Sequence, residues 1–210
     1  MTEIWTDERR DSKAQGYDIA KREDAVYALL DTIPTEDGGR EGLQETPKRV
    51  AKMYEELFAG YEMDYHKILS KQFTVDGKPS TIEVKDINFY SMCEHHIMPF
   101  FGTIDITYQP KVGGKVVGLS KLARLVECFA RRLQIQERLG KQICDALVEC
   151  LDPNMVQVKI TAEHTCMTAR GINKPGSKTT TTTIYNFEEN ISEIVLRHAG
   201  VEANFGEGGK

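Results

Sequence analysis

Two short clusters of cysteine and histidine carry the most chemical information in this sequence. Residues 93–96 read Cys-Glu-His-His, and residues 164–166 read His-Thr-Cys about seventy residues later. Thiolate and imidazole are the ligands that Zn²⁺ prefers in proteins. Because two cysteines and three histidines gather in these clusters, we expect them to bind one Zn²⁺ ion.

The spacing within the clusters predicts which side chains are the ligands. Cys93 and His96, three residues apart, can reach one metal from a tight turn, and Cys166 can supply a third ligand. Three protein ligands leave the fourth tetrahedral position to water, which is typical of a catalytic zinc site. His95 then remains available for proton transfer. If residues 156–166 form a strand, His164 lies on the same face as Cys166.

The alternative is that these residues are buried thiols and hydrogen-bonded core histidines. For a lone cysteine or histidine that interpretation is the better one. Here three of the five histidines lie beside two of the five cysteines, which favours a metal. The remaining cysteines, Cys128, Cys144 and Cys150, are interpreted as small packing residues.

A second chemical signal is a local excess of positive charge. Residues 111–141 contain eight lysines or arginines and only two acids, in a chain whose net charge is −5. Such an excess favours an anionic ligand, although several of these side chains would simply form a solvated helix face. Ser120, Lys121 and Arg124 cluster at an expected helix start, where backbone N–H groups attract anions.

Hydrophobic periodicity predicts the elements that position these residues. Thr46 and Ser120 are expected to cap helices, and the threonine run at 179–183 suits a strand. Together the elements predict an α+β fold with an antiparallel sheet covered by helices on one face. We expect helices over 19–33, 46–58, 120–129, 135–147 and 191–198, and strands over 82–90, 100–108, 156–162 and 179–185.

Length and composition limit the class of protein. A chain of 210 residues with 40% hydrophobic residues fits one globular domain with an extension. Its acidic balance argues against nucleic-acid binding, and no apolar run is long enough to span a membrane. Five free thiols without an export signal suggest the cytoplasm. We expect a flexible tail (1–18), a helical extension (19–60), a catalytic domain (61–200) and a flexible Gly-rich tail (201–210).

Five separate stretches resemble GTP cyclohydrolase I: residues 45–53, 93–96, 118–121, 134–139 and 164–171. The resemblance implies the tunnelling fold, in which subunits pool their sheets into a toroidal barrel. It implies a homodecamer of two pentamers with active sites at subunit junctions. It also implies the hydrolysis and rearrangement of GTP to 7,8-dihydroneopterin triphosphate with release of formate, the first step of pterin and tetrahydrofolate biosynthesis.

The resemblance also implies roles for individual residues of this sequence. The zinc ligands would be Cys93, His96 and Cys166. The catalytic residues would be His95, His164 and Ser120. Substrate would be bound by Gln136 and Glu137 at guanine, by Lys121, Arg124 and Arg170 at the ribose and triphosphate, and by Arg49 and Lys52 from an adjacent subunit.

Three other functions remain as alternatives at this point. One is the tunnelling-fold nitrile reductase that acts on a deazaguanine, which uses a cysteine nucleophile and NADPH. Another is a zinc nucleobase deaminase, although its Pro-Cys-x-x-Cys segment is missing here. The last is a non-catalytic module that binds zinc and a nucleotide. Formate release from GTP would distinguish the cyclohydrolase from all three.

Overall fold

A computed structural model describes residues 18–34 and 40–186 of the chain. Residues 1–17 of the expected N-terminal tail (1–18), the expected tail at 201–210 and the expected helix at 191–198 lie outside these residues. The chain divides into two units, Met1–Phe58 and Ala59–Lys210. The described part of the first unit consists of α1 (Ile19–Asp31), α2 (Glu41–Gln44) and α3 (Thr46–Leu57).

The expected cap of α3 is wrong by one residue. Glu45 occupies the N-cap position, and Thr46 is already helical with Pro47 following it. The Thr46 hydroxyl donates to the carbonyl of Gly42 at 3.2 Å. It therefore forms a hydrogen bond with the preceding short helix and does not cap its own helix. Asp18 does act as a cap, because its carboxylate accepts from the backbone N–H of Lys21.

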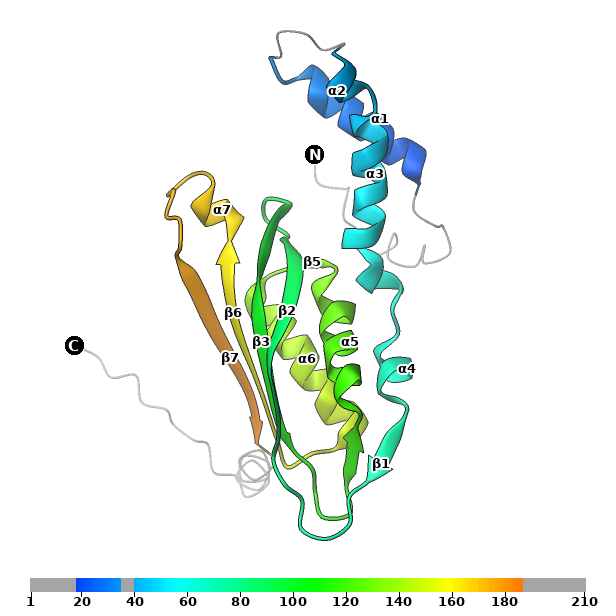
Figure 1. Ribbon diagram of the computed structural model, residues 1–210, viewed down its shortest axis with the longest axis vertical. Helices are drawn as coiled ribbons and strands as arrows, with labels where there is room; N and C mark the ends of the chain where they lie inside the picture. Colours follow the sequence, from blue (N-terminus) through cyan, green and yellow to red (C-terminus); the bar gives the residue numbers. More distant parts are fainter. Residues whose placement is uncertain (1–17, 35–39, 187–210) are drawn as a thin grey trace, which may run out of the picture. The chain divides into compact units, whose positions relative to one another are not determined.

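A five-stranded sheet forms the centre of the second unit (Figure 1). Its strands lie in the order β5-β2-β3-β6-β7. The four long strands pair antiparallel, as expected, whereas the two-residue β5 pairs parallel with the end of β2. Their bounds are β2 (Ile82–Cys93), β3 (Met98–Gln109), β5 (Leu133–Gln134), β6 (Met155–His164) and β7 (Lys178–Asn186).

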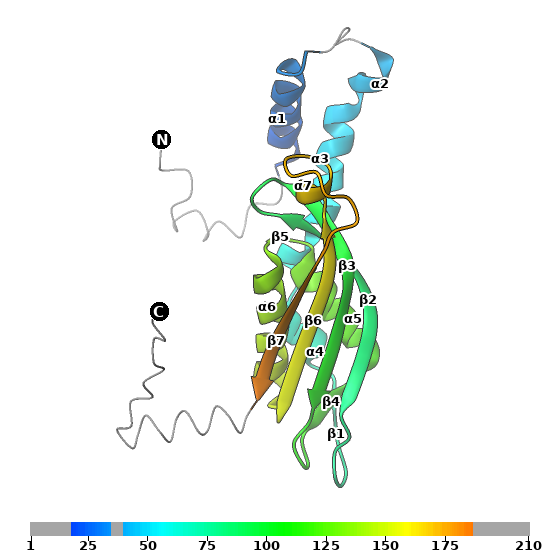
Figure 2. The same ribbon diagram turned by 90° about the vertical axis from the view of Figure 1, so that its left-hand side faces the viewer.

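Two amphipathic helices cover one face of this sheet (Figure 2). These are α5 (Leu119–Ala130) and α6 (Gln136–Leu151), whose apolar stripes pack on alternate residues of the strands. Ser120 does not cap α5, because Gly118 is the N-cap residue and no side chain caps the helix. The fold is therefore the α+β arrangement predicted from the sequence.

Short elements complete the second unit. They are η2 (Ala59–Glu62), α4 (Tyr65–Leu69), β1 (Gln72–Thr74), β4 (Lys115–Val117) and α7 (Thr165–Thr168). The glycine turn after β3 does not close a hairpin within the main sheet, because β4 pairs antiparallel with β1. The backbone N–H of Val117 donates to the buried hydroxyl of Tyr108, which places the start of α5 near the Tyr108 end of β3.

The sheet has one unusually close strand pair and one strand of alternating burial. At Gly102 a Cβ atom would overlap the carbonyl oxygen of Thr161 and lie 2.8 Å from the Cα of Ala162, so β3 and β6 approach too closely for a side chain. In β7, burial alternates along the threonine run: Thr179, Thr181 and Thr183 are partly buried and the residues between them are exposed. None of the described helices has the length and apolar character that crossing a bilayer requires.

Candidate active site and metal centre

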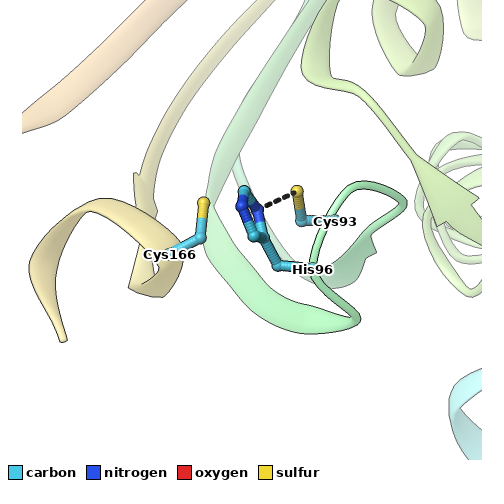
Figure 3. A group of neighbouring side chains, drawn as sticks. All are labelled: Cys93, His96 and Cys166. Atoms are coloured by element: carbon cyan, nitrogen blue, oxygen red, sulfur yellow. Dashed lines mark hydrogen bonds between the residues drawn. The ribbon is translucent and has the colours of Figure 1, made fainter. Parts of the chain in front are cut away.

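The predicted metal ligands converge at one end of the sheet (Figure 3). Cys93 is the last residue of β2, His96 lies in the turn after it, and Cys166 lies on α7. One ligand atom from each residue lies within 4.8 Å of the others. The strand that was expected to carry Cys166 ends earlier. β6 ends at His164, and the chain then turns into the short helix α7, which carries Cys166.

Several bonds hold the turn that carries His96. The backbone N–H of Ile97 donates to the carbonyl of Cys93 at 2.8 Å, and Ile97 adopts a positive φ of 51°. The backbone N–H of Glu94 donates to the carbonyl of Gln134 at 3.0 Å. The Glu94 carboxylate forms an ion pair with Arg138, whose Nε also donates to the side chain of Gln134. The turn is thus fixed to both β5 and α6.

The donor set fits a thiophilic divalent cation. The Cys93 Sγ and His96 Nδ1 atoms are 3.9 Å apart, close to the roughly 3.5 Å that bond lengths of about 2.3 and 2.0 Å give around a tetrahedral zinc ion. Burial and the neighbouring Cys93 thiol raise the pKa of Cys166, and a cation beside the thiol would lower it again. These three residues can therefore hold a metal.

A cavity of about 190 Å³ opens beside the metal ligands. It is lined by both cysteines of the cluster and by the predicted residues His95, His164 and Glu137, together with the backbone and side chains of neighbouring segments. His95 Nδ1 also lies 3.9 Å from Cys93 Sγ, but His95 is not part of the three-residue ligand group. The structure thus brings together residues from β2, α6, β6 and α7.

His164 is held from two sides. Its ring stacks on Phe100 with centroids 4.6 Å apart and planes only 2° from parallel. Its Nε2 atom lies 2.8 Å from the Oε1 atom of Gln136. Burial lowers the pKa of His164, and the Glu137 carboxylate partly offsets this by stabilising the charged ring.

Gln136 occupies a different environment from the one expected. It is only 2% exposed, and its amide already bonds to His164 and to oxygens of β6 and β7. Glu137, the next residue, is exposed and lines the cavity. Of the two residues expected at guanine, Glu137 has the more accessible side chain.

The predicted phosphate ligands divide among three places. Arg170 lies near the cluster, with Nη1 3.3 Å from His96 Nε2. Lys121 and Arg124 lie on α5, where they line a separate hollow of about 290 Å³ with Asp64 and Lys67. Arg49 and Lys52 lie on α3 in the first unit.

The start of α5 lies at the opposite end of the sheet from the cluster (Figure 1). Cys93 pairs with Met98 at one end of the β2–β3 hairpin, and Ile82 pairs with Tyr108 at the other. Twelve residues of strand at about 3.3 Å each separate these ends by about 35 Å. Ser120 and Lys121 lie at the start of α5, a helix about 18 Å long whose other end leads into β5 beside Cys93.

Sequence reasoning missed the supports of the site. Neither the ion pair of Glu94 with Arg138 nor the bond of Gln136 to His164 was expected. The Glu94 position inside the first cluster was a signal, because an acid adjacent to metal ligands often orients them. Nothing in the sequence identified the partner of His164.

Comparison with known proteins assigns the family. The sequence profile described as GTP cyclohydrolase I matches residues 22–196. The chain is 54% identical to GTP cyclohydrolase 1 of Carboxydothermus hydrogenoformans over 80% of its length and 85% of the relative. It is 54% identical to GTP cyclohydrolase 1 of Streptococcus pyogenes over 82% of this chain and 88% of that relative. A solved apo archaeosine synthase QueF-like structure aligns with 53% of this chain and 97% of its own at 16% identity and a TM-score of 0.42.

Proposed function

The chain belongs to the GTP cyclohydrolase I family, and from that membership we propose how its residues act in that reaction. The activity is the conversion of GTP to dihydroneopterin triphosphate. The family assignment decides against the nitrile reductase, the deaminase and the non-catalytic module. The observation that supports a catalytic site is the open cavity beside Cys93, His96 and Cys166.

The resident metal is Zn²⁺, held by Cys93, His96 and Cys166. Two thiols and one imidazole suit zinc better than a hard cation such as Mg²⁺. When bound with an open fourth position, zinc supplies a water molecule that deprotonates near neutral pH. The ion pair of Glu94 with Arg138 ties the ligand turn to α6.

The neighbouring side chains supply proton transfer and recognition. Opening the imidazole ring of guanine between C8 and N9 requires a proton at a ring nitrogen, and His164 is placed in the cavity to deliver it. His95 is available for the proton transfers of the later rearrangement. Glu137 is the guanine anchor, because one carboxylate can accept from N1–H and from the exocyclic amine together. Adenine would leave that carboxylate without donors.

The triphosphate is bound by another copy of the chain. Ser120, Lys121 and Arg124 lie on the first two turns of α5, whereas it is the other end of that helix that leads into β5 beside the metal cluster. The metal cluster and these α5 residues can serve one reaction if the α5 start of one subunit faces the cluster of the next. Arg170 then binds phosphate from the metal side, and Arg49 and Lys52 add further contacts. This supports a homo-oligomer, for which we propose the homodecamer of two pentamers. Five free cysteines support a reducing compartment, the cytoplasm.

Incubation of the purified protein with GTP tests the function. We expect stoichiometric formate and dihydroneopterin triphosphate, and one zinc per subunit by elemental analysis. Cys166→Ser should lose zinc and turnover together, whereas His164→Ala should keep zinc and release little formate. Full activity of a zinc-free preparation, or NADPH oxidation in place of formate release, would contradict the assignment.

A further inference from the structure

Gln136 uses its whole side-chain amide within the protein. Its Nε2 atom lies 3.1 Å from each of three oxygens: the carbonyls of Ile160 and Thr179 and the hydroxyl of Thr181. Its Oε1 atom lies 2.8 Å from Nε2 of His164. The side chain lines the cavity but is almost completely buried, and both ends of its amide already have partners within the protein.

The two carbonyls determine which way the amide points. A carbonyl oxygen can only accept hydrogen bonds, so the NH₂ group of Gln136 must face Ile160 and Thr179. The Oε1 atom must then face His164. Since Oε1 can only accept, His164 Nε2 must carry a proton and donate it. The backbone geometry of β6 and β7 therefore fixes the tautomer of a side chain at the end of β6.

We propose that Gln136 is a positioning residue for His164, holding the ring with Nε2 protonated, so that Nδ1 is the atom that takes up a proton from solvent and passes it to the substrate. This inference rests on the proposed function for the role of His164. Among the residues that the structure describes, none forms a hydrogen bond with Nδ1. The stack on Phe100 prevents the ring from tilting, so the two contacts together define both its plane and its tautomer.

The same arrangement separates Gln136 from Glu137. The two residues are adjacent at the start of α6, and both were expected at guanine. Both residues line the cavity, but Glu137 is exposed, whereas Gln136 is buried and its amide bridges the helix to β6 and β7. Gln136 therefore acts on GTP through His164 and makes no guanine contact of its own.

Steady-state kinetics of Gln136→Met distinguish these roles. Methionine keeps the length of the side chain and removes all four hydrogen bonds. We expect kcat to fall by about 10- to 100-fold, as for a catalytic group displaced by a fraction of an ångström to one ångström, with KM for GTP changed less than about 3-fold. A raised KM with unchanged kcat would show a guanine contact and overturn the proposal.

Thr181→Val is the matched control. It removes one of the three oxygens that Gln136 Nε2 contacts and leaves the bond to His164 intact. Because the two carbonyls still orient the amide, kcat should stay within about 3-fold of the wild type. A loss as large as that of Gln136→Met would mean that packing between α6 and β7, and not the His164 bond, matters.

Solid-state NMR of ¹⁵N-histidine-labelled protein reads the tautomer directly and needs no GTP. His164 is assigned by the signals that His164→Gln removes. We expect a single Nε2–H tautomer in the wild type and in Thr181→Val, and a mixture in Gln136→Met. A wild-type ring protonated at Nδ1 would overturn the proposal even if formate release is normal. Failure of the wild type to release formate, with the expected tautomer, would instead count against the proposed function.

Discussion

Mixing two inactive variants tests whether each active site is built from two subunits. Cys166→Ser removes a metal ligand, and Arg124→Ala with Lys121→Ala removes the basic residues on α5. The start of α5 lies about one helix length from the metal cluster, because α5 is about 18 Å long and leads into β5, which pairs with the Cys93 end of β2. If a site combines the metal cluster of one subunit with the α5 start of another, the two variants can complement each other.

The expected recovery follows from random assembly. In equal mixtures, half of the metal clusters are intact, and half of the α5 starts that face them are intact. About one quarter of the sites then contain two functional halves. Loss of two charged phosphate contacts should reduce the activity of the α5 variant by at least about 10- to 100-fold, so recovery to about a quarter of wild-type activity is well above background.

The assay is formate release by oligomers co-expressed with two different affinity tags and purified through both. A mixture of Cys166→Ser with His164→Ala is the control, because both changes affect the same half of the site. Every site in that mixture has one defect, and no recovery is expected. If the first mixture recovers no more than this control, the phosphate residues do not act across a subunit boundary.

Three further changes test the site and the fold. Glu137→Gln should raise KM for GTP by about 10- to 100-fold with zinc content unchanged, because one acceptor for the guanine donors is lost; an unchanged KM would place the anchor elsewhere. Gly102→Ala should lower the free energy of unfolding by about 3 kcal/mol or more in urea, because its Cβ would overlap the carbonyl of Thr161, whereas Gly42→Ala, in open space, should have little effect. Ile97→Gly should raise that free energy by about 0.5–1 kcal/mol, since it relieves a positive φ at a β-branched residue; a decrease would show that the conformation is not strained.

The metal ligands and the long elements could be predicted because each leaves a local signal. Residue type and spacing identified Cys93 and His96, and periodicity identified α5 and α6. The predicted helix caps were wrong because the N-cap residue is set by where the backbone becomes helical, which the side-chain type alone does not determine. Thr46 and Ser120 have the right side chains for helix caps, but each lies inside the first turn of its helix.

The supports of the site depend on strand register, which no short stretch of sequence encodes. Gln136 meets His164 only because β6 and β7 pair so that the Ile160 and Thr179 carbonyls lie beside the start of α6. The parallel strand β5 has two residues, too few for any periodic pattern. Such contacts become visible only when elements distant in the sequence are assembled.

The five consecutive threonines of β7 look uniform in the sequence and are not uniform in the fold. Thr181 contacts Gln136, and the Thr183 hydroxyl lies 3.0 Å from where a Cβ on Gly140 would sit, whereas the Thr180 hydroxyl pairs with that of Thr161. Deleting a single threonine would barely alter the composition. Threonine would still occupy position 181 and contact Gln136, because its neighbours in the run are identical to it. The residues after the run, from Ile184 onward, would instead move by one position and turn to the other side of the sheet.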